Sequence, residues 1–177
     1  MQEKIEIRQI RPSDRLTGLS LGDPVFLPLK IFLQKHAKVY HERNLARTYA
    51  AFDASQGNKV VAYTTLVSGE IVLEGDKSLL DEPDVHYNYK SYPALKIARL
   101  AVHEKYRGYG LGQLLVQLAL GTAKEIICPA IGCRFVAVDS KRQAVDFYLK
   151  QGFALLDTRQ NRDRSEPVLF IDLHKAS

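Results

Sequence analysis

A chain of 177 residues with 46% hydrophobic and 25% charged residues has the composition of one globular domain, and it excludes a disordered or fibrous chain. Lysine and arginine outnumber aspartate and glutamate by 25 to 20, and the net charge of +5 permits an anionic partner without demanding one. No apolar run approaches the ~20 residues of a membrane span, the N-terminus lacks a signal-peptide core, and Cys128 and Cys133 complete no zinc-type set. We expect one cytoplasmic domain over residues 1–177, without a metal site and without a membrane partner.

The first half of the chain predicts strands around one helical segment. Residues 3–10 alternate polar and apolar, which is typical of a half-buried strand. Residues 24–41 carry apolar side chains at helical spacing, so we expect one helix there, or two short helices split by Pro28. Residues 46–53 and 59–69 are β-rich on either side of a polar turn with a glycine, and they predict a hairpin.

The middle of the chain predicts an irregular segment, a strand and a long helix. Residues 70–92 are the least regular, and we expect a loop there with at most one short strand. Residues 93–103 predict a strand, and residues 111–127 a helix packed on a sheet. The expected buried face of that helix consists of Leu114, Leu115, Leu118, Thr122 and Ile126.

The last third predicts two more strands and one more helix. Residues 133–138 form an apolar run of the buried-strand type, and residues 167–173 form another. Residues 142–151 predict a helix that ends at Gly152, a residue suited to the left-handed position after a helix. Strands and helices in this order predict a single αβ domain with a mixed sheet.

One short stretch points to chemistry. Residues 107–112 read RGYGLG between a predicted strand and a predicted helix. The first turn of a helix offers unpaired N–H groups and the positive end of a dipole, and glycines let a phosphate approach the backbone closely. A phosphate-binding P-loop is excluded because no GK[ST] follows, and a dinucleotide fingerprint fails because Gln113 stands where its third glycine belongs. The pattern R-x-x-G-x-G remains, against a plain glycine-rich turn.

Two motifs carry a resemblance to a known family. ARLAVHEKYRGYGLGQLL resembles the central acyl-CoA motif of the GNAT superfamily of N-acetyltransferases, and AVDFYLKQGFALL resembles its second motif at the matching distance. The resemblance covers about residues 46–173. It implies an α+β fold with a mixed, mostly antiparallel central sheet that splays at the cofactor site and is flanked by helices.

The resemblance also implies a site for acetyl-CoA as acetyl donor. The pantetheine arm would pair with the backbone of Leu100, Ala101 and Val102. The pyrophosphate would lie on the N–H groups of the glycine stretch, with charge added by its arginine. The residues of that stretch are Arg107, Gly108, Tyr109, Gly110, Leu111 and Gly112.

Tyr148 stands where the family places its general acid. A phenol with a pKa near ~10 is protonated at neutral pH and can donate to the leaving thiolate. The alternative is a tyrosine that packs in the core. His103 or Glu104 could serve as a general base, although both residue types are common in loops, and an α-amine of low pKa needs no strong base.

The acceptor amine is addressed by a basic segment and by a second resemblance. Lys35, Lys38, Arg43 and Arg47 lie in a stretch with one acid, which predicts a phosphate-binding surface or a solvated helix face. The segments FLQKHAKVYHERNLARTYAAFD and VVAYTTLVSGEI are similar to the GNAT toxins of bacterial toxin–antitoxin pairs. That resemblance implies acetylation of the α-amine of aminoacyl-tRNA, a homodimer and a small antitoxin partner. A GNAT enzyme for a small amine or a protein N-terminus, and a non-catalytic acyl-CoA-binding module, stay open as alternatives.

Overall fold

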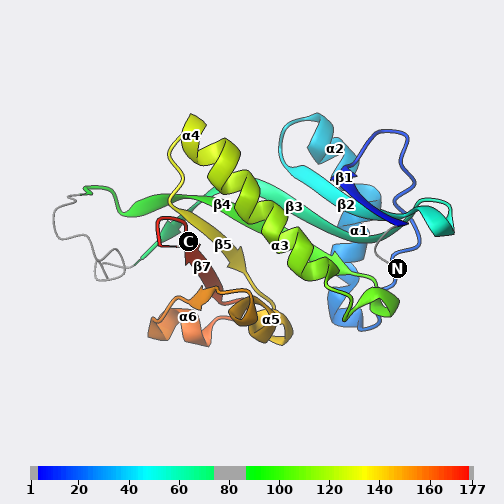
Figure 1. Ribbon diagram of the computed structural model, residues 1–177. Coiled ribbons are helices and arrows are strands. Elements are labelled where there is room, and N and C mark those ends of the chain that lie inside the picture. Colours follow the sequence, from blue (N-terminus) through cyan, green and yellow to red (C-terminus); the bar gives the residue numbers. More distant parts are fainter. Residues whose placement is uncertain (1–3, 74–86, 176–177) are drawn as a thin grey trace. The chain divides into compact units, whose positions relative to one another are not determined.

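The computed structural model describes residues 4–73 and 87–175 (Figure 1). The strands form one seven-stranded sheet in the order β1-β2-β3-β4-β5-β7-β6. The chain divides into two compact units. Unit 1 comprises Met1–Val67 and Ile97–Leu118, and unit 2 comprises Ser68–Lys96 and Ala119–Ser177. Strands β3 and β4 run through both units, and each unit is described separately below.

In unit 1, strands β1, β2 and β3 pair antiparallel, and β2 and β3 form a hairpin. Strand β1 (Ile5–Gln9) pairs with β2 (Arg47–Asp53), which pairs in turn with β3 (Lys59–Val72), and a register shift interrupts the second pair. The turn between β2 and β3 contains a 3-10 turn, Ala54–Gln56, followed by a left-handed glycine. The predicted hairpin is confirmed, and β3 continues three residues beyond its expected end.

The helical segment at residues 24–42 breaks at a different residue from the one expected. A 3-10 turn, Pro24–Phe26, leads into α1 (Leu27–Lys35), and α2 (Ala37–Glu42) follows after His36. Pro28 lies in the first turn of α1, where a proline costs no intrahelical hydrogen bond, so it helps to start the helix and does not split it.

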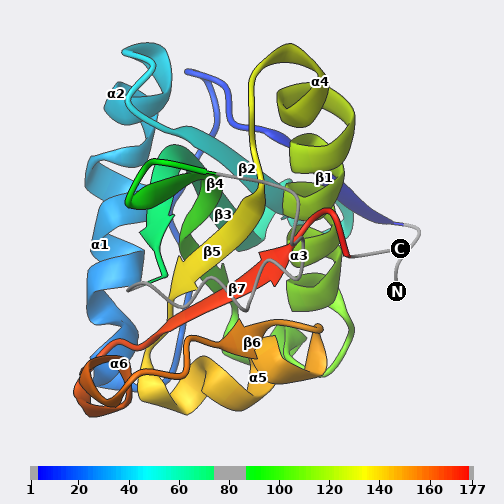
Figure 2. The same cartoon turned by 90° about the vertical axis from the view of Figure 1, so that its left-hand side faces the viewer.

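Helices cover both faces of the unit 1 sheet, with α1 and α2 on one side and the N-terminal part of α3 on the other (Figure 2). Strand β4 (Ser91–Val102) shows the two-residue alternation that this requires, because Ala101 packs with the α1 side whereas Leu100 and Val102 pack with the α3 side. The α1-side cluster consists of Ile10, Leu16, Leu19, Leu21, Phe32, Leu33, Ala37, Ala50, Phe52, Val60, Tyr63 and Ala101.

The long helix is correctly placed, and its predicted buried face is right at Leu115 but wrong at Leu114 and Ile126. Helix α3 (Leu111–Thr122) continues without a break through a π-helical turn, Ala123–Ile127, into α4 (Cys128–Ala130). The expected face includes Leu114 and Ile126, whose exposed fractions are 38% and 61%. The residues that are buried are Leu111, Leu115, Val116, Ala119 and Ala123. Apolar side chains lie on most sides of this helix, so the spacing of apolar residues does not determine which side faces the sheet.

The same helical run bears on the expectation about membranes. Residues 111–130 form a 20-residue helix that is long and apolar enough, by length and composition, to cross a membrane. The expectation that no apolar run approaches this length is therefore wrong. A buried core helix has the same composition, and five residues of this run are buried, so the finding assigns no membrane role.

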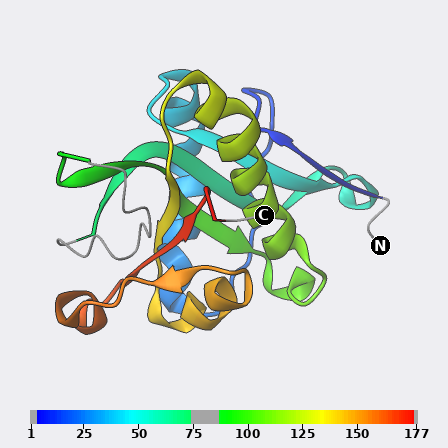
Figure 3. The ribbon, with the colours of Figure 1, turned by 60° about the vertical axis from the view of Figure 1, so that its left-hand side comes forward.

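Unit 2 contains the C-terminal strands and short helices. Strand β5 (Phe135–Asp139) pairs antiparallel with β7 (Val168–Asp172), and β7 pairs with the short β6 (Ala154–Leu155), beside which it lies in Figure 3. A 3-10 turn, Arg142–Ala144, precedes α5 (Val145–Lys150), and α6 (Arg159–Asp163) follows β6. The second motif implies a strand after Gly152, where β6 lies, but α6 was not predicted. Helix α6 is capped by Thr158 and held by the buried Asn161, whose amide donates to two backbone carbonyls.

Candidate active site

The glycine stretch of unit 1 forms an open loop between β4 and α3. After a 3-10 turn, Glu104–Tyr106, the backbone of Gly108 and Gly110 takes left-handed φ values of 83° and 81°. A Cβ atom built at either glycine would meet no atom within 4 Å. Since a side chain would have room at both positions, glycine is needed there for the left-handed backbone conformation and not to avoid a clash. A ligand can therefore reach the backbone at this loop.

The start of α3 supplies the donors for an anion. The first helical hydrogen bond joins the Leu114 N–H to the Gly110 carbonyl at 3.0 Å, so the N–H groups of Leu111, Gly112 and Gln113 precede it and have no intrahelical acceptor. The first helical turn contains no acidic residue. Free N–H groups, a positive dipole end and an accessible glycine backbone fit a pyrophosphate.

Strand β4 presents alternate backbone groups to its two edges. The His103 N–H donates to the Val61 carbonyl of β3 at 2.8 Å, so the amide and carbonyl of Ala101, two residues earlier, also face β3. Leu100 and Val102 turn theirs to the opposite edge. Of the three residues expected to pair with a pantetheine arm, the geometry of unit 1 favours these two and leaves the backbone of Ala101 to the sheet.

Arg107 is partly committed within the protein. Its Nη2 donates to the Leu21 carbonyl at 2.5 Å, and its guanidinium lies 5.6 Å from the centre of the Phe26 ring. The side chain is exposed and keeps other N–H donors. Arg107 thus joins the glycine loop to the segment that leads into α1, and it still has donors for a phosphate.

The two residues considered as general bases have structural partners. His103 is 3% exposed; its Nδ1 accepts from the Lys105 N–H at 3.2 Å, and its Nε2 lies 3.4 Å from Lys59 Nζ. Burial, and then the Lys59 charge, lower the pKa of His103. Glu104 accepts from the Ser20 hydroxyl at 2.5 Å. Both residues brace the entry to the loop, and nothing in their surroundings marks a base.

Tyr148 of unit 2 lies on α5 with a hydroxyl that no described residue engages. The ring is 5% exposed and packs edge-on against Phe147 and Phe153, at 5.0 and 5.3 Å between ring centres. The Tyr148 carbonyl accepts from the N–H groups of Gln151 and Phe153, which closes α5 at the left-handed Gly152, as the sequence predicts. Burial raises the pKa of the Tyr148 hydroxyl, so it is protonated at neutral pH.

Two other tyrosines of the chain have committed hydroxyls. Tyr63 donates to the Leu29 carbonyl at 2.6 Å, and Tyr106 donates to Asp53 Oδ2 at 2.6 Å. The bond to Asp53 raises the pKa of Tyr106 to about 12. In the described part of the chain, every side-chain oxygen that is fully inaccessible to solvent has a hydrogen bond. The Tyr148 hydroxyl has none, so it is not fully inaccessible and can be reached by solvent or by a ligand.

Unit 2 also contains a hollow of about 270 Å³. The Lys96–Asp139 ion pair lies in its wall, and Asn161 lines it from α6. Its walls are formed by Glu70, Ile71, Val72, Lys96, Ala137, Asp139, Leu156, Gln160, Asn161, Arg164 and Val168. In the described ranges, no group of three or more histidine, cysteine, aspartate or glutamate side chains could hold a metal ion, and Cys128 and Cys133 are free thiols.

The basic segment separates into two kinds of side chain. Lys38 donates to the Pro12 carbonyl at 2.6 Å, and Arg47 donates to the His41 carbonyl and to Asn44 Oδ1. These two cations are used internally. The side chains of Lys35 and Arg43 are exposed, and within residues 4–73 and 87–175 neither side chain has a hydrogen bond or an ion pair.

Comparisons with known proteins agree with this geometry. The model of the acetyltransferase (GNAT) family matches residues 25–153. A protein of Mycobacterium tuberculosis described as a tRNA-acetylating toxin is 29% identical over 154 residues, which cover 85% of each chain.

Two solved structures share the fold. AtaT complexed with acetyl-methionyl-tRNAfMet aligns with a TM-score of 0.80 at 22% identity, over 96% of this chain and 95% of that one. A tyrosine-to-phenylalanine mutant of AtaT, bound to the C-terminus of the antitoxin AtaR and to acetyl-CoA, aligns with a TM-score of 0.74 at 21% identity, over 97% and 94%. The family model covers well over half of the sequence, including both motifs, and the chain belongs to the acetyltransferase (GNAT) family.

Proposed function

We propose that this protein transfers the acetyl group of acetyl-CoA to the α-amine of aminoacyl-tRNA. The observation that carries the transferase assignment is the open loop at Gly108–Gly112, which offers free N–H groups at the start of α3. The acceptor is supported by the relative described as a tRNA-acetylating toxin and by the AtaT complex with an acetylated aminoacyl-tRNA.

In this proposal, unit 1 binds the donor. The N–H groups of Leu111, Gly112 and Gln113 receive the pyrophosphate, and a free N–H of Arg107 adds charge. Leu100 and Val102 pair with the pantetheine arm through backbone groups on the strand edge that faces away from β3. The glycine loop also explains why the pattern lacks a Walker lysine, since backbone dipoles supply most of the positive potential.

Tyr148 is the proposed donor to the departing sulfur. A simple thiol has a pKa near ~8.5, below that of a buried phenol, so full proton transfer from Tyr148 to a thiolate is uphill. Its hydroxyl therefore acts chiefly as a hydrogen-bond donor while negative charge develops. The acetylated nitrogen, which is acidic until it loses its proton, can supply the proton that finally neutralises the thiolate.

The amine needs little help to become a nucleophile. An α-amino group with a pKa near ~7.7–8.0 is partly neutral at pH 7, so the reaction does not require His103 or Glu104 as a base. A lysine ε-amine near ~10.4 would require one. An α-amine acceptor is therefore compatible with the structural roles of His103 and Glu104 described above.

The relatives also support proposals about partners. AtaT has been solved with the C-terminus of its antitoxin AtaR, and we propose a small antitoxin partner for this chain. A cytoplasmic location follows from the proposed substrate, and a homodimer and a single domain over residues 1–177 stay predictions.

Labelled acetyl-CoA and total charged tRNA test the proposed function directly. Mild alkaline release should yield labelled N-acetyl amino acids from the tRNA fraction. If label is found only in free amines or at protein N-termini, the acceptor is not aminoacyl-tRNA, and the alternative GNAT enzyme is the correct assignment. Tight acetyl-CoA binding with no labelled product in any fraction would identify a non-catalytic acyl-CoA-binding module.

A further inference from the structure

Two arginines of unit 1 stack on phenylalanine rings, and they differ at the edge of the guanidinium. The Arg8 guanidinium lies 4.1 Å from the centre of the Phe52 ring, and that of Arg99 lies 3.6 Å from the Phe32 ring. A stacked guanidinium uses its face for the cation–π contact, and its N–H donors stay in the plane, pointing outward.

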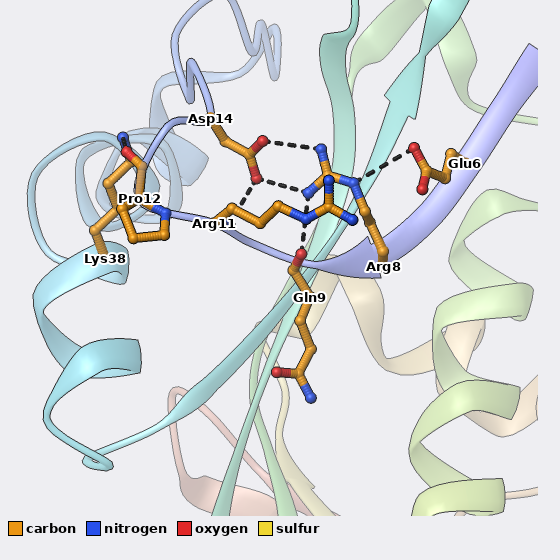
Figure 4. Close-up of polar contacts among 7 residues, drawn as sticks. All are labelled: Glu6, Arg8, Gln9, Arg11, Pro12, Asp14 and Lys38. Carbon is orange, nitrogen blue, oxygen red and sulfur yellow. Dashed lines mark hydrogen bonds and ion pairs between the residues drawn. The ribbon is translucent and has the colours of Figure 1, made fainter.

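Both Nη groups of Arg8 are paired within the protein, whereas its buried Nε has an ion-pair contact but no hydrogen bond (Figure 4). Its Nη1 and Nη2 donate to the two oxygens of Asp14 at 2.7 and 2.8 Å, and its Nε lies 3.4 Å from Glu6. Nη1 also donates to the Gln9 carbonyl at 3.0 Å. This is the forked pairing that a guanidinium forms with a carboxylate, and it shows what a structural arginine looks like in this fold.

The Arg99 edge has no such partner. No side chain or carbonyl in the described ranges accepts a hydrogen bond from its guanidinium, and no acid lies within ion-pair distance. The side chain is half-buried. The Phe32 ring offsets part of the hydration that a half-buried guanidinium loses, and the in-plane N–H donors stay available to a ligand.

The position of Arg99 on β4 indicates which ligand its guanidinium binds. The two-residue alternation of β4 puts Arg99 on the α1 side with Ala101, and its neighbour Leu100 is the first residue proposed to pair with the pantetheine arm. The nearby Tyr63 hydroxyl donates its proton to the Leu29 carbonyl, and no hydrogen bond among the described residues joins its oxygen to Arg99. Arg99 thus lies on the sheet face that α1 and α2 cover, and the same helical segment carries the exposed cations Lys35 and Arg43, which suit an anionic acceptor.

We propose that the free edge of Arg99 binds, as a fork, the phosphodiester of the 3′-terminal nucleotide of the aminoacylated acceptor. This inference rests on the proposed function. A phosphodiester offers two unesterified oxygens that match the guanidinium fork, whereas lysine offers only a point charge. Arg99 is then a substrate-binding residue that places the terminal nucleotide, and with it the amine, against the thioester.

The experiment uses the full chain and an acceptor-stem minihelix whose amino acid is joined by a stable amide. Affinity is measured by fluorescence anisotropy across a salt series for the wild type, Arg99→Lys and Arg99→Met. Arg99→Lys should weaken binding about tenfold, because charge alone does not replace the fork, and Arg99→Met should weaken it further and reduce the salt slope by about one unit. Acetyl-CoA affinity and Tm should stay near those of the wild type.

A second substrate series locates the contact. Each of the last three phosphates is replaced in turn by an uncharged methylphosphonate. Neutralising the terminal phosphodiester should cost the wild type about tenfold in affinity, and Arg99→Met should lose almost nothing further from the same change. Arg8→Met is the matched control, since it also removes a stacked guanidinium; it should lower Tm and leave the wild-type response to the methylphosphonates intact.

The outcomes separate this inference from the function on which it rests. Wild-type protein that neither binds the minihelix nor acetylates charged tRNA would overturn the proposed function. Wild-type protein that does both, with unchanged affinity in both Arg99 variants or equal methylphosphonate effects in wild type and Arg99→Met, would overturn the Arg99 assignment alone.

Discussion

Arg8 and Arg99 have the same side chain and the same kind of aromatic neighbour, but the Nη groups of Arg8 pair with an acid, whereas no described residue pairs with the guanidinium of Arg99. The tyrosines repeat the contrast, because the hydroxyls of Tyr63 and Tyr106 have partners within the protein and that of Tyr148 has none among the described residues. Saturated groups contribute to stability when their partners are kept. In the proposals above, the open groups of Tyr148 and Arg99 gain their partner from a ligand. The four predictions below sharpen this contrast or break it.

The largest effect is expected at Tyr148. Tyr148→Phe keeps the packing against Phe147 and Phe153 and removes the open hydroxyl, so kcat should fall about 10²-fold, with little change in acetyl-CoA affinity. Tyr63→Phe is the matched control, because it removes a saturated hydroxyl: it should lower stability by about 1 kcal/mol and leave kcat nearly unchanged. Steady-state kinetics and thermal unfolding of both variants measure this. Equal kcat in Tyr148→Phe and wild type would make Tyr148 a packing residue.

The glycine loop permits a similar pairing of variants. Gly110 and Gly57 both have left-handed φ values, 81° and 67°, and open space around them. Aspartate at either position has the same strained backbone, but only Gly110→Asp puts a negative charge where the pyrophosphate is proposed to bind. Acetyl-CoA affinity should fall at least tenfold, about 1.4 kcal/mol, in Gly110→Asp and hardly at all in Gly57→Asp. Calorimetric titration checks this, and equal affinities in the two variants would remove the loop from the donor site.

The basic segment predicts a smaller effect, at two of its four members. Reversal of the free cations, Lys35→Glu with Arg43→Glu, should weaken charged-tRNA binding about fivefold at moderate salt and flatten the salt dependence by about two units, if both contact phosphates. Lys38→Met and Arg47→Met remove cations that are bound internally, so they should affect stability more than tRNA affinity. A salt series with each protein decides this. If Lys38→Met flattens the salt dependence as strongly as the double reversal, the division into free and committed cations is wrong.

The smallest effect concerns the ion pair between Arg8 and Asp14. The hydrogen bond from Arg8 holds the pKa of Asp14 below its usual value. A carboxyl whose folded pKa is lowered contributes stability that is present above the unfolded value, near ~3.9, and is lost as the pH falls through the folded value. Asp14→Asn should therefore lower stability by about 1 kcal/mol at neutral pH and by less near pH 3. Urea unfolding across this range checks the sign, and a difference that grows toward low pH would contradict it.

Local patterns predicted most of the elements correctly. Period-two alternation located β1 and β2, a glycine at a left-handed position closed α5, and the order of strand, glycines and helix located the open glycine loop. These features depend on φ/ψ preferences and side-chain spacing within a few residues. The same reasoning missed α6, because a five-residue helix held by the buried Asn161 has no periodicity to detect.

The residues of the donor loop and the position of Tyr148 were therefore available from the amino-acid order, since both belong to motifs of contiguous residues whose backbone conformation is set locally. Three-dimensional packing was needed for everything that depends on which groups meet. It turned α3 so that Ala119, and not Leu114, joins Leu115 in the core, used Lys38 and Arg47 internally, and paired Arg8 with an acid, whereas no described acid pairs with Arg99. Side-chain pairing joins residues from separate strands and loops. Whether a given side chain finds a partner depends on distances in the folded chain that no local sequence pattern encodes.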